Sequence, residues 1–237
     1  MDDSAETELW TPHGIVYPPG TEYPPTQAHS TSCFMRMCQL SEIFNQILIH
    51  IYDPLGQNSE VEISACLASE GEALRRWWED LPDFLKIDAK TPPPYCPPSH
   101  IVTLKYNYYP KLMEKKLTES SCLFLTFKIL LYRPMLFRRT SSSSGLQRPD
   151  PSHLVECITS ATSIIAIFDL FCRTFGERYC ILSLSYSVYI AASIFLLQIQ
   201  AARSQDEQTL KRLQFCIQAL ERVKAYNPGT RPASHEI

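Results

Sequence analysis

Apolar residues recur at steps of three and four along most of the chain, which is the pattern of amphipathic helices. The first stripe follows Ser30, Thr31 and Ser32, which offer helix N-caps, and stops near Asp53-Pro54. Its members are Met37, Leu40, Phe44, Ile47, Leu48 and Ile51. This pattern predicts a helix that runs from the hydroxyl-rich cluster to Asp53.

A second helix is predicted from Ser59, because Ser59 and Glu62 have the spacing of a capping box. Pro82 ends it, since the residue before a proline disfavours helical backbone. Its apolar stripe consists of Ile63, Cys66, Leu67, Leu74, Trp77, Trp78 and Leu81.

The apolar pattern resumes after a proline-rich connector at residues 82–98. Apolar residues run from Ile101 to Leu104, and residues 122–131 are almost wholly apolar up to Tyr132-Arg133-Pro134. Residues 138–150 contain four consecutive serines and are interpreted as a loop.

Three further helices are predicted in the second half of the chain. One starts at Asp150-Pro151, a cap followed by a proline at the first helical position. The others span about residues 182–202 and 207–226, with Pro228-Gly229 as the stop. The expected inner faces are Leu154, Ile158, Ala161, Ile165 and Phe168 for the first, and Leu210, Leu213, Ile217 and Leu220 for the last. No stretch alternates with period two, so the sequence predicts an all-α fold, an irregular multi-helix bundle with Pro-rich connectors.

Glycine and proline counts sharpen this prediction. The seven glycines are scattered, so neither common Gly-rich nucleotide-binding loop is present. Twelve of the 18 prolines lie at or before Pro98. We therefore expect an extended Pro-rich strap at residues 1–28, a helical domain at 29–227 and a tail at 228–237.

Charge and cysteine content restrict the class of protein. A net charge of −3 lacks the basic excess of a surface that neutralises phosphates, so this segment is not expected to bind DNA or RNA by itself. Nine cysteines without a C-x-x-C motif or an apolar signal peptide favour a reducing, intracellular compartment. Cys66, Cys122, Cys157 and Cys216 fall within helical patterns and are interpreted as small buried hydrophobes rather than metal ligands.

A membrane-spanning helix is the alternative for one segment. Tyr179 to Ala202 is 24 residues without a charge, which is long enough to span a bilayer. The stretch also carries four serines and two glutamines and lacks an asymmetric basic flank. We therefore favour a helix buried in a bundle and expect no membrane contact.

Signatures of catalysis are weak. The chain has neither G-x-S-x-G nor H-E-x-x-H. His50 is the one histidine expected inside a helix, and no residue three or four positions away would orient it as a base or ligand. Glu79, Asp80 and Asp83 are interpreted as the solvated end of a helix rather than as an acid and base pair. The sequence predicts no enzyme, no catalytic residue and no metal or cofactor site in this chain.

One modification site is a candidate. Ser141 follows Arg138-Arg139 in the serine-rich loop, and a phosphate there would have Arg133, Arg138 and Arg139 as charge partners. The alternative is a solvated linker.

Several phrases together resemble the fungal-specific transcription factor domain, the helical middle region that follows the zinc binuclear cluster in many fungal regulators. The specific ones are Leu130-Leu131-Tyr132-Arg133-Pro134-Met135-Leu136 and Trp78-Glu79-Asp80-Leu81-Pro82. Weaker support comes from Cys157-Ile158 with residues 161–165, and from Tyr186 to Leu197. Trp10-x-Pro12, Phe34 to Tyr52 and residues 97–102 look most like the nitrate-assimilation type of regulator.

The resemblance implies a nuclear regulatory or interaction domain that controls transcription by RNA polymerase II. Its partners would be other regions of a full-length regulator, protein partners or a second copy in a homodimer. The six-cysteine module that holds two zinc ions and reads DNA in that family is not in this chain. DNA binding and zinc would belong to that module, so this chain resembles the rear part of such a regulator.

One segment departs from the family pattern. The chain inserts about sixteen residues, 105–120, between the phrases at residues 100–104 and 122–136. The two explanations are a lineage-specific loop and a translated intron. A helical protein-interaction or membrane-associated protein without a link to DNA is the alternative reading of the whole chain.

Overall fold

The computed structural model describes residues 6–17, 20, 22–87, 93–103, 121–136, 151–201 and 206–226. Seven α-helices dominate these residues, together with one pair of two-residue strands. The predicted all-α fold is confirmed. The expected insertion at 105–120, the loop at 138–150 with Ser141, Arg138 and Arg139, and the tail at 228–237 lie outside the described residues.

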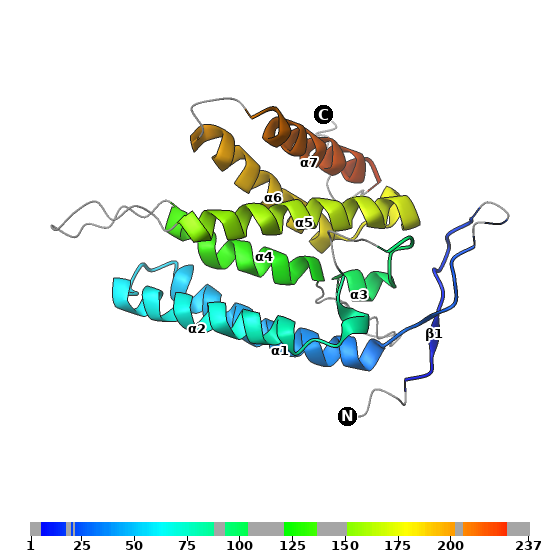
Figure 1. Ribbon diagram of the computed structural model, residues 1–237, viewed down its shortest axis with the longest axis horizontal. Coiled ribbons are helices and arrows are strands. Elements are labelled where there is room, and N and C mark those ends of the chain that lie inside the picture. Colours follow the sequence, from blue (N-terminus) through cyan, green and yellow to red (C-terminus); the bar gives the residue numbers. More distant parts are fainter. Residues whose placement is uncertain are drawn as a thin grey trace, which may run out of the picture.

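The helices stack in layers. Figure 1 shows α1 (Ser30–Ile51) and α2 (Glu60–Glu79) as one layer, α4 (Ser121–Tyr132) and α5 (Pro151–Phe175) as the next, and α6 (Leu182–Ala201) with α7 (Glu207–Tyr226) as the third. The short α3 (Ser99–Thr103) lies beside α4. Helix α4 contacts α1, α2, α5 and α6, which explains why its sequence is almost wholly apolar.

Capping at its N-terminus and a proline after its C-terminus explain where α2 begins and ends. Ser59 Oγ accepts the backbone N–H of Glu62, and the Glu62 carboxylate accepts the backbone N–H of Ser59 at 2.7 Å. This reciprocal pair is the predicted capping box. Helix α2 ends at Glu79, and Pro82 precedes a short 3₁₀ turn, Asp83–Leu85, as the proline predicts.

The start of α1 differs from the sequence prediction. Ser30, Thr31 and Ser32 lie inside the helix, and the N-cap position is His29, which has a left-handed φ of 47° and no capping side chain. The carboxylate of Glu6 accepts the backbone N–H groups of Thr31 and Ser32 instead. The prediction was wrong because a residue distant in sequence supplies the cap.

The described part of the N-terminal strap contacts the helical bundle through several side chains. Strand β1 (Leu9–Trp10) pairs antiparallel with β2 (Thr26–Gln27), a pairing that the period-two analysis did not predict. Trp10 meets Phe175 edge to face at 5.8 Å, and Tyr23 donates to the Cys96 carbonyl at 2.8 Å. These contacts attach the strap to α5 and to the segment before α3.

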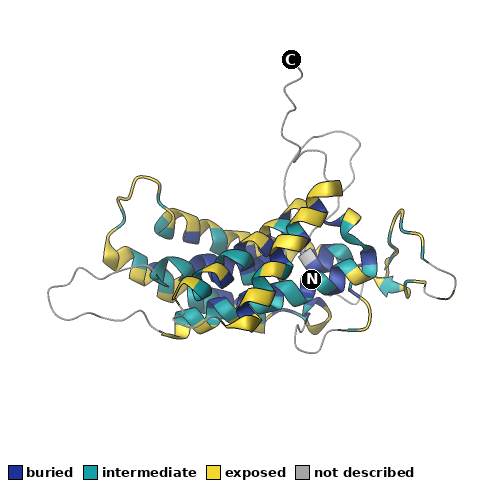
Figure 2. Cartoon of the chain, turned by 90° about the horizontal axis from the view of Figure 1, so that it is seen from above, coloured by how far each residue is buried: buried dark blue, intermediate teal, exposed yellow. Residues whose placement is uncertain are grey.

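Buried apolar side chains from all seven helices form one core (Figure 2). Two predicted inner faces need correction. In α7 the buried residues are Thr209, Cys216, Ala219 and Val223, whereas Leu210 and Ile217 are exposed. Small residues on this face let α7 approach α6 closely. The buried stripe of α7 is therefore shifted by one residue from the stripe of larger aliphatic residues that the sequence predicted.

The buried face of α5 is also displaced. Ala161 and Phe168 are buried as expected, but Leu154, Ile158 and Ile165 are only half-buried. Cys157, Ile164, Ile167 and Phe171 are buried in their place. Helix α5 contacts both α4 and α6, and this broad contact buries more positions than one amphipathic stripe contains.

Candidate functional site

A cleft between α2, α4 and α5 is the candidate site. Its volume is about 600 Å³, which is within the usual range of small-molecule sites. Its walls are Gly71, Leu74, Arg75, Trp78, Glu79, Lys86, Ile87, Phe124, Leu125, Lys128, Tyr132, Glu156, Thr159, Ser163 and Ile167. We call it the α2–α4 cleft.

Stacked aromatic rings form one side of this cleft. The ring of Trp78 stacks on Phe124 with centroids 4.9 Å apart, and Trp77 stacks on the same phenyl ring at 5.5 Å. Trp77 is buried, and its Nε1 donates to the Arg36 carbonyl at 2.9 Å. Trp78 remains half-buried and lines the cleft. The indole of Trp77 thus fixes Phe124 from the core, while Trp78 offers an aromatic surface to the cleft.

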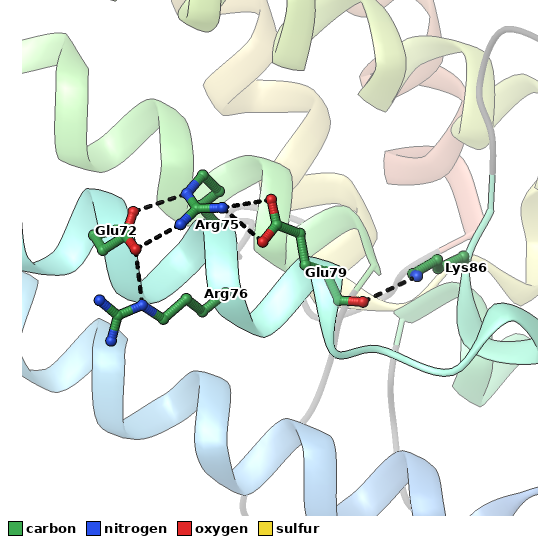
Figure 3. Close-up of polar contacts among 5 residues, drawn as sticks. All are labelled: Glu72, Arg75, Arg76, Glu79 and Lys86. Carbon is green, nitrogen blue, oxygen red and sulfur yellow. Dashed lines mark hydrogen bonds and ion pairs between the residues drawn. The ribbon is translucent and has the colours of Figure 1, made fainter.

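Alternating charges on α2 border the cleft. Arg75 pairs with Glu72 and Glu79, each at 2.6 Å, and Arg76 Nε donates to Glu72 at 2.8 Å (Figure 3). Hydrogen bonds from Arg75 and Arg76 lower the pKa of Glu72 to about 2. These groups are solvent-exposed, so each pair adds little stability. The network nevertheless sets the orientation of Arg75 at the border.

Two lysines reach the cleft from its other sides. Lys128 of α4 pairs with Glu156 of α5 at 2.5 Å. Lys86 follows α2, and its ammonium donates to the Glu79 carbonyl oxygen and to Asp83, each at 3.3 Å. Figure 3 shows Lys86 pointing toward the end of α2. Both lysine side chains are about three-quarters buried.

A smaller hollow of about 450 Å³ continues the cleft along α2. It shares Gly71, Arg75 and Tyr132 with the larger space. The Tyr132 ring stacks on His153 at 5.0 Å, and its hydroxyl lies 2.9 Å from where a Cβ on Gly71 would be. The absence of a side chain at Gly71 therefore lets Tyr132 close over α2 between the two spaces.

The acidic residues singled out in the sequence do not form a catalytic pair. Glu79, Asp80 and Asp83 are all exposed, with Glu79 paired to Arg75 and Asp83 to Lys86. Their interpretation as the solvated end of a helix is confirmed. Only Glu79 lines the cleft, and its partner there is a guanidinium rather than a second carboxylate.

The cysteines are thiols buried in the core with few exceptions. None of the nine is in a disulfide; seven are buried, Cys172 is half-buried and Cys38 is exposed. Cys66, Cys122, Cys157 and Cys216 are buried as predicted. Burial raises the pKa of Cys157 to about 12, which suppresses thiolate chemistry at neutral pH. Within the described ranges, no three His, Cys, Asp or Glu side chains are grouped as metal ligands.

Two histidines have different environments. His50 is half-buried, and its Nδ1 is enclosed without a hydrogen-bond partner among the described residues. His100, which sequence reasoning did not single out, is buried, and its Nε2 bonds with the Ala28 carbonyl. Desolvation lowers the pKa of His100. Neither lines the α2–α4 cleft.

A separate hollow of about 650 Å³ lies between the end of α5 and α7. Its lining carries three arginines and two carboxylates, of which Arg173 pairs with Asp169 and Arg222 with Glu177. Arg178 lies 5.9 Å from the centroid of the Tyr179 ring. The hollow is more open than the α2–α4 cleft and presents less apolar surface.

Two helices, α5 and α6, have the length and composition to cross a membrane, with mean hydropathy of 1.8 and 1.7 over their most apolar stretches. Helix α6 packs against α4, α5 and α7. Leu182, Tyr186, Tyr189 and Leu196 remain exposed on it. Core helices of soluble proteins can have the same length and hydropathy, so this observation is weak support for a membrane role.

Sequence reasoning missed the cleft as a site. It noted Trp78 and Glu79 only as part of a helix end, and it did not connect them with Phe124 or Lys128. The available signal was Gly71 inside an otherwise helical pattern, because an internal helix glycine often marks a close approach. Comparison with protein families, with curated proteins and with solved structures finds no match to this chain.

Proposed function

We propose that this chain is the regulatory domain of a fungal transcription factor, acting in the nucleus on transcription by RNA polymerase II. In this proposal the α2–α4 cleft receives an effector or a partner segment. DNA contact and zinc belong to a binuclear cluster module outside this chain, and homodimer contacts are part of the same expectation.

One observation carries the proposal. The two phrases that support the family resemblance are separated by about fifty residues, yet both contribute side chains to the lining of one cleft. Trp78 and Glu79 come from the end of α2, and Tyr132 comes from the end of α4. Leu81 and Leu131, from the same phrases, are buried in the common core. If the two phrases mark one binding region of the family, they are expected to lie together in the folded chain, as they do here.

The chemistry of the cleft favours binding over catalysis. No histidine or cysteine is among its described lining residues, and Glu156 is engaged by Lys128. Ser163 and Thr159 also line the cleft, and its two carboxylates, Glu79 and Glu156, are held in ion pairs with Arg75 and Lys128. The surface that the lining exposes to the cleft is mostly apolar, with charged groups at its border, which is typical of recognition sites. We therefore propose a non-enzymatic role.

The proposal is tested by deleting the gene in its host and measuring RNA polymerase II transcripts, while a tagged full-length product is followed by microscopy and by detergent-free fractionation. We expect nuclear signal and a reproducible set of transcripts that change on deletion. Unchanged transcripts under all inducing conditions would contradict the regulatory role. A product that pellets with membranes would support the membrane-associated alternative that α5 and α6 allow.

A further inference from the structure

The α2–α4 cleft has an excess of positive charge. Its described lining carries three cations, Arg75, Lys86 and Lys128, against two carboxylates, Glu79 and Glu156. The chain as a whole has a net charge of −3, so this local excess is opposite to the overall balance. Glu72 and Asp83, outside this lining, also pair with Arg75 and Lys86, through solvent-exposed contacts. The lining itself therefore favours an anionic over a cationic ligand.

The three cations are not equally engaged. Lys128 is matched by Glu156 at 2.5 Å, and Arg75 is held between two carboxylates of its own helix. Lys86 donates to the uncharged Glu79 carbonyl oxygen at 3.3 Å and has one ionic partner, Asp83, at 3.3 Å, whose side chain is 99% exposed. Water weakens such a pair. Among the described lining residues, Lys86 is therefore the cation with most capacity to accept a new anionic partner.

An apolar surface lies beside this ammonium group. Ile87 follows Lys86 directly and lines the same cleft, together with Leu74, Trp78 and Phe124. The stacking of Trp78 on Phe124 leaves the indole half-buried, and a flat ring can pack against such a surface. The cleft thus combines an aromatic wall with one weakly paired cation.

We propose that the α2–α4 cleft binds a small apolar carboxylic acid, with its ring or alkyl body against Trp78 and its carboxylate on the Lys86 ammonium. This inference rests on the proposed function, since it names the class of effector that the regulatory domain receives. A small molecule is favoured over a peptide helix because the anionic contact is a single group near an enclosed apolar wall.

The test uses a matched pair of probes on the purified full chain. 1-Naphthaleneacetic acid and 1-naphthaleneacetamide share the same rings and differ in the charge of one group. Calorimetry is expected to give a Kd of about 1 mM or tighter for the acid, as is usual for a ligand of this size. The amide is expected to bind about tenfold more weakly, because it lacks the charge-assisted contact.

Two substitutions locate the contact. Lys86→Met keeps the aliphatic stem and should reduce acid affinity about tenfold while leaving amide affinity unchanged. Glu156→Gln releases Lys128 from its ion pair and should strengthen acid binding. Lys211→Met, on the exposed surface of α7 and outside the cleft lining, is the matched control and should change neither. Circular dichroism verifies that each variant is folded.

Equal affinity for acid and amide, or a Lys86→Met variant that binds the acid like the wild type, overturns the proposal. Binding of neither probe also overturns it. These outcomes are independent of the transcript measurement, because they are read from purified protein. If the protein regulates transcripts but does not bind the acid, only the proposed ligand class is wrong. If it binds the acid but its deletion leaves transcripts unchanged, the proposed regulatory function is wrong.

Discussion

Glu6 Oε1 accepts a hydrogen bond from the backbone N–H of Thr31 at 2.8 Å, so a residue 25 positions earlier caps the first turn of α1. The same oxygen accepts the N–H of Ser32 at 3.2 Å, and Oε2 lies 3.8 Å from His29 Nδ1. A carboxylate at a helix N-terminus also faces the positive end of the helix dipole. This side chain is a further attachment of the N-terminal strap to the bundle, beside the contacts of Trp10 and Tyr23.

Replacing Glu6 by Ala is expected to lower the free energy of unfolding by about 1 kcal/mol, the usual value for a lost N-cap. Glu6→Gln retains an amide oxygen as acceptor and should lose less. Urea unfolding measures both, and amide exchange at Thr31 and Ser32 reports the local effect. Glu8→Ala, at an exposed neighbouring position, is the control. Equal stability of Glu6→Ala and Glu8→Ala would contradict the capping role.

Gly71 and Tyr132 are expected to be energetically coupled. Alanine in the middle of a helix is more favourable than glycine by about 1 kcal/mol, but a Cβ at position 71 would lie 2.9 Å from the Tyr132 hydroxyl. Gly71→Ala should therefore stabilise the Tyr132→Phe variant by about 1 kcal/mol and the wild type by clearly less. Chemical unfolding of the four proteins of this cycle measures the coupling. Additive effects would show that the hydroxyl does not restrict position 71.

Glu72 should contribute to the acid dependence of stability. Its folded-state pKa is lowered from 4.5 to about 2 by hydrogen bonds from Arg75 and Arg76. A lowered folded-state pKa means that the contribution is present above the unfolded value and is lost as pH falls from 4.5 toward about 2. The stability difference between wild type and Glu72→Gln should therefore vanish at low pH.

Denaturant unfolding between pH 2 and pH 6 measures this difference, with Glu42→Gln on α1 as the control for removing one exposed charge. The effect should also shrink in 1 M salt, because the partners are exposed. A Glu72→Gln difference that stays constant over this pH range would contradict the assignment.

Thiol labelling should separate the cysteines by exposure. Cys38 is the one exposed cysteine of the nine, so native protein at pH 8 should react quickly with about one equivalent of an aromatic disulfide reagent. Cys172, half-buried and with a pKa raised by burial to about 12, should follow slowly. The remaining seven should react only after unfolding. Cys38→Ser should abolish the fast phase, and persistence of that phase would contradict the burial pattern.

The sequence predicted those parts of the fold that depend on neighbouring residues. Ser59 and Glu62 form the capping box because its geometry is local, and Pro82 and Pro151 mark helix limits for the same reason. The cap of α1 and the role of His100 depend on contacts with the strap, so periodicity could not reveal them. In α7, Cys216 and Ala219 are buried where Leu210 and Ile217 were expected, because close helix packing selects small apolar residues over large ones.

The candidate site was less accessible to prediction than the fold. Trp78, Phe124 and Glu156 belong to three helices, and only their packing brings them to one cleft. The phrases that carry the family resemblance contribute residues to the lining of the cleft, but their sequences alone do not indicate that a cleft forms between them. Ser141 stays a predicted modification site outside the described residues.

The central claim is that the chain regulates transcription through the α2–α4 cleft, and a chromosomal Trp78→Leu variant tests it most directly. This change removes the aromatic wall while keeping an apolar side chain. The variant should alter the RNA polymerase II transcripts of the same genes as complete deletion does, although its protein abundance equals that of the wild type. The Lys211→Met control should have the transcript profile of the wild type. A Trp78→Leu profile identical to the wild type, beside a deletion that alters transcripts, would contradict the role of the cleft. A silent deletion would contradict the regulatory function itself.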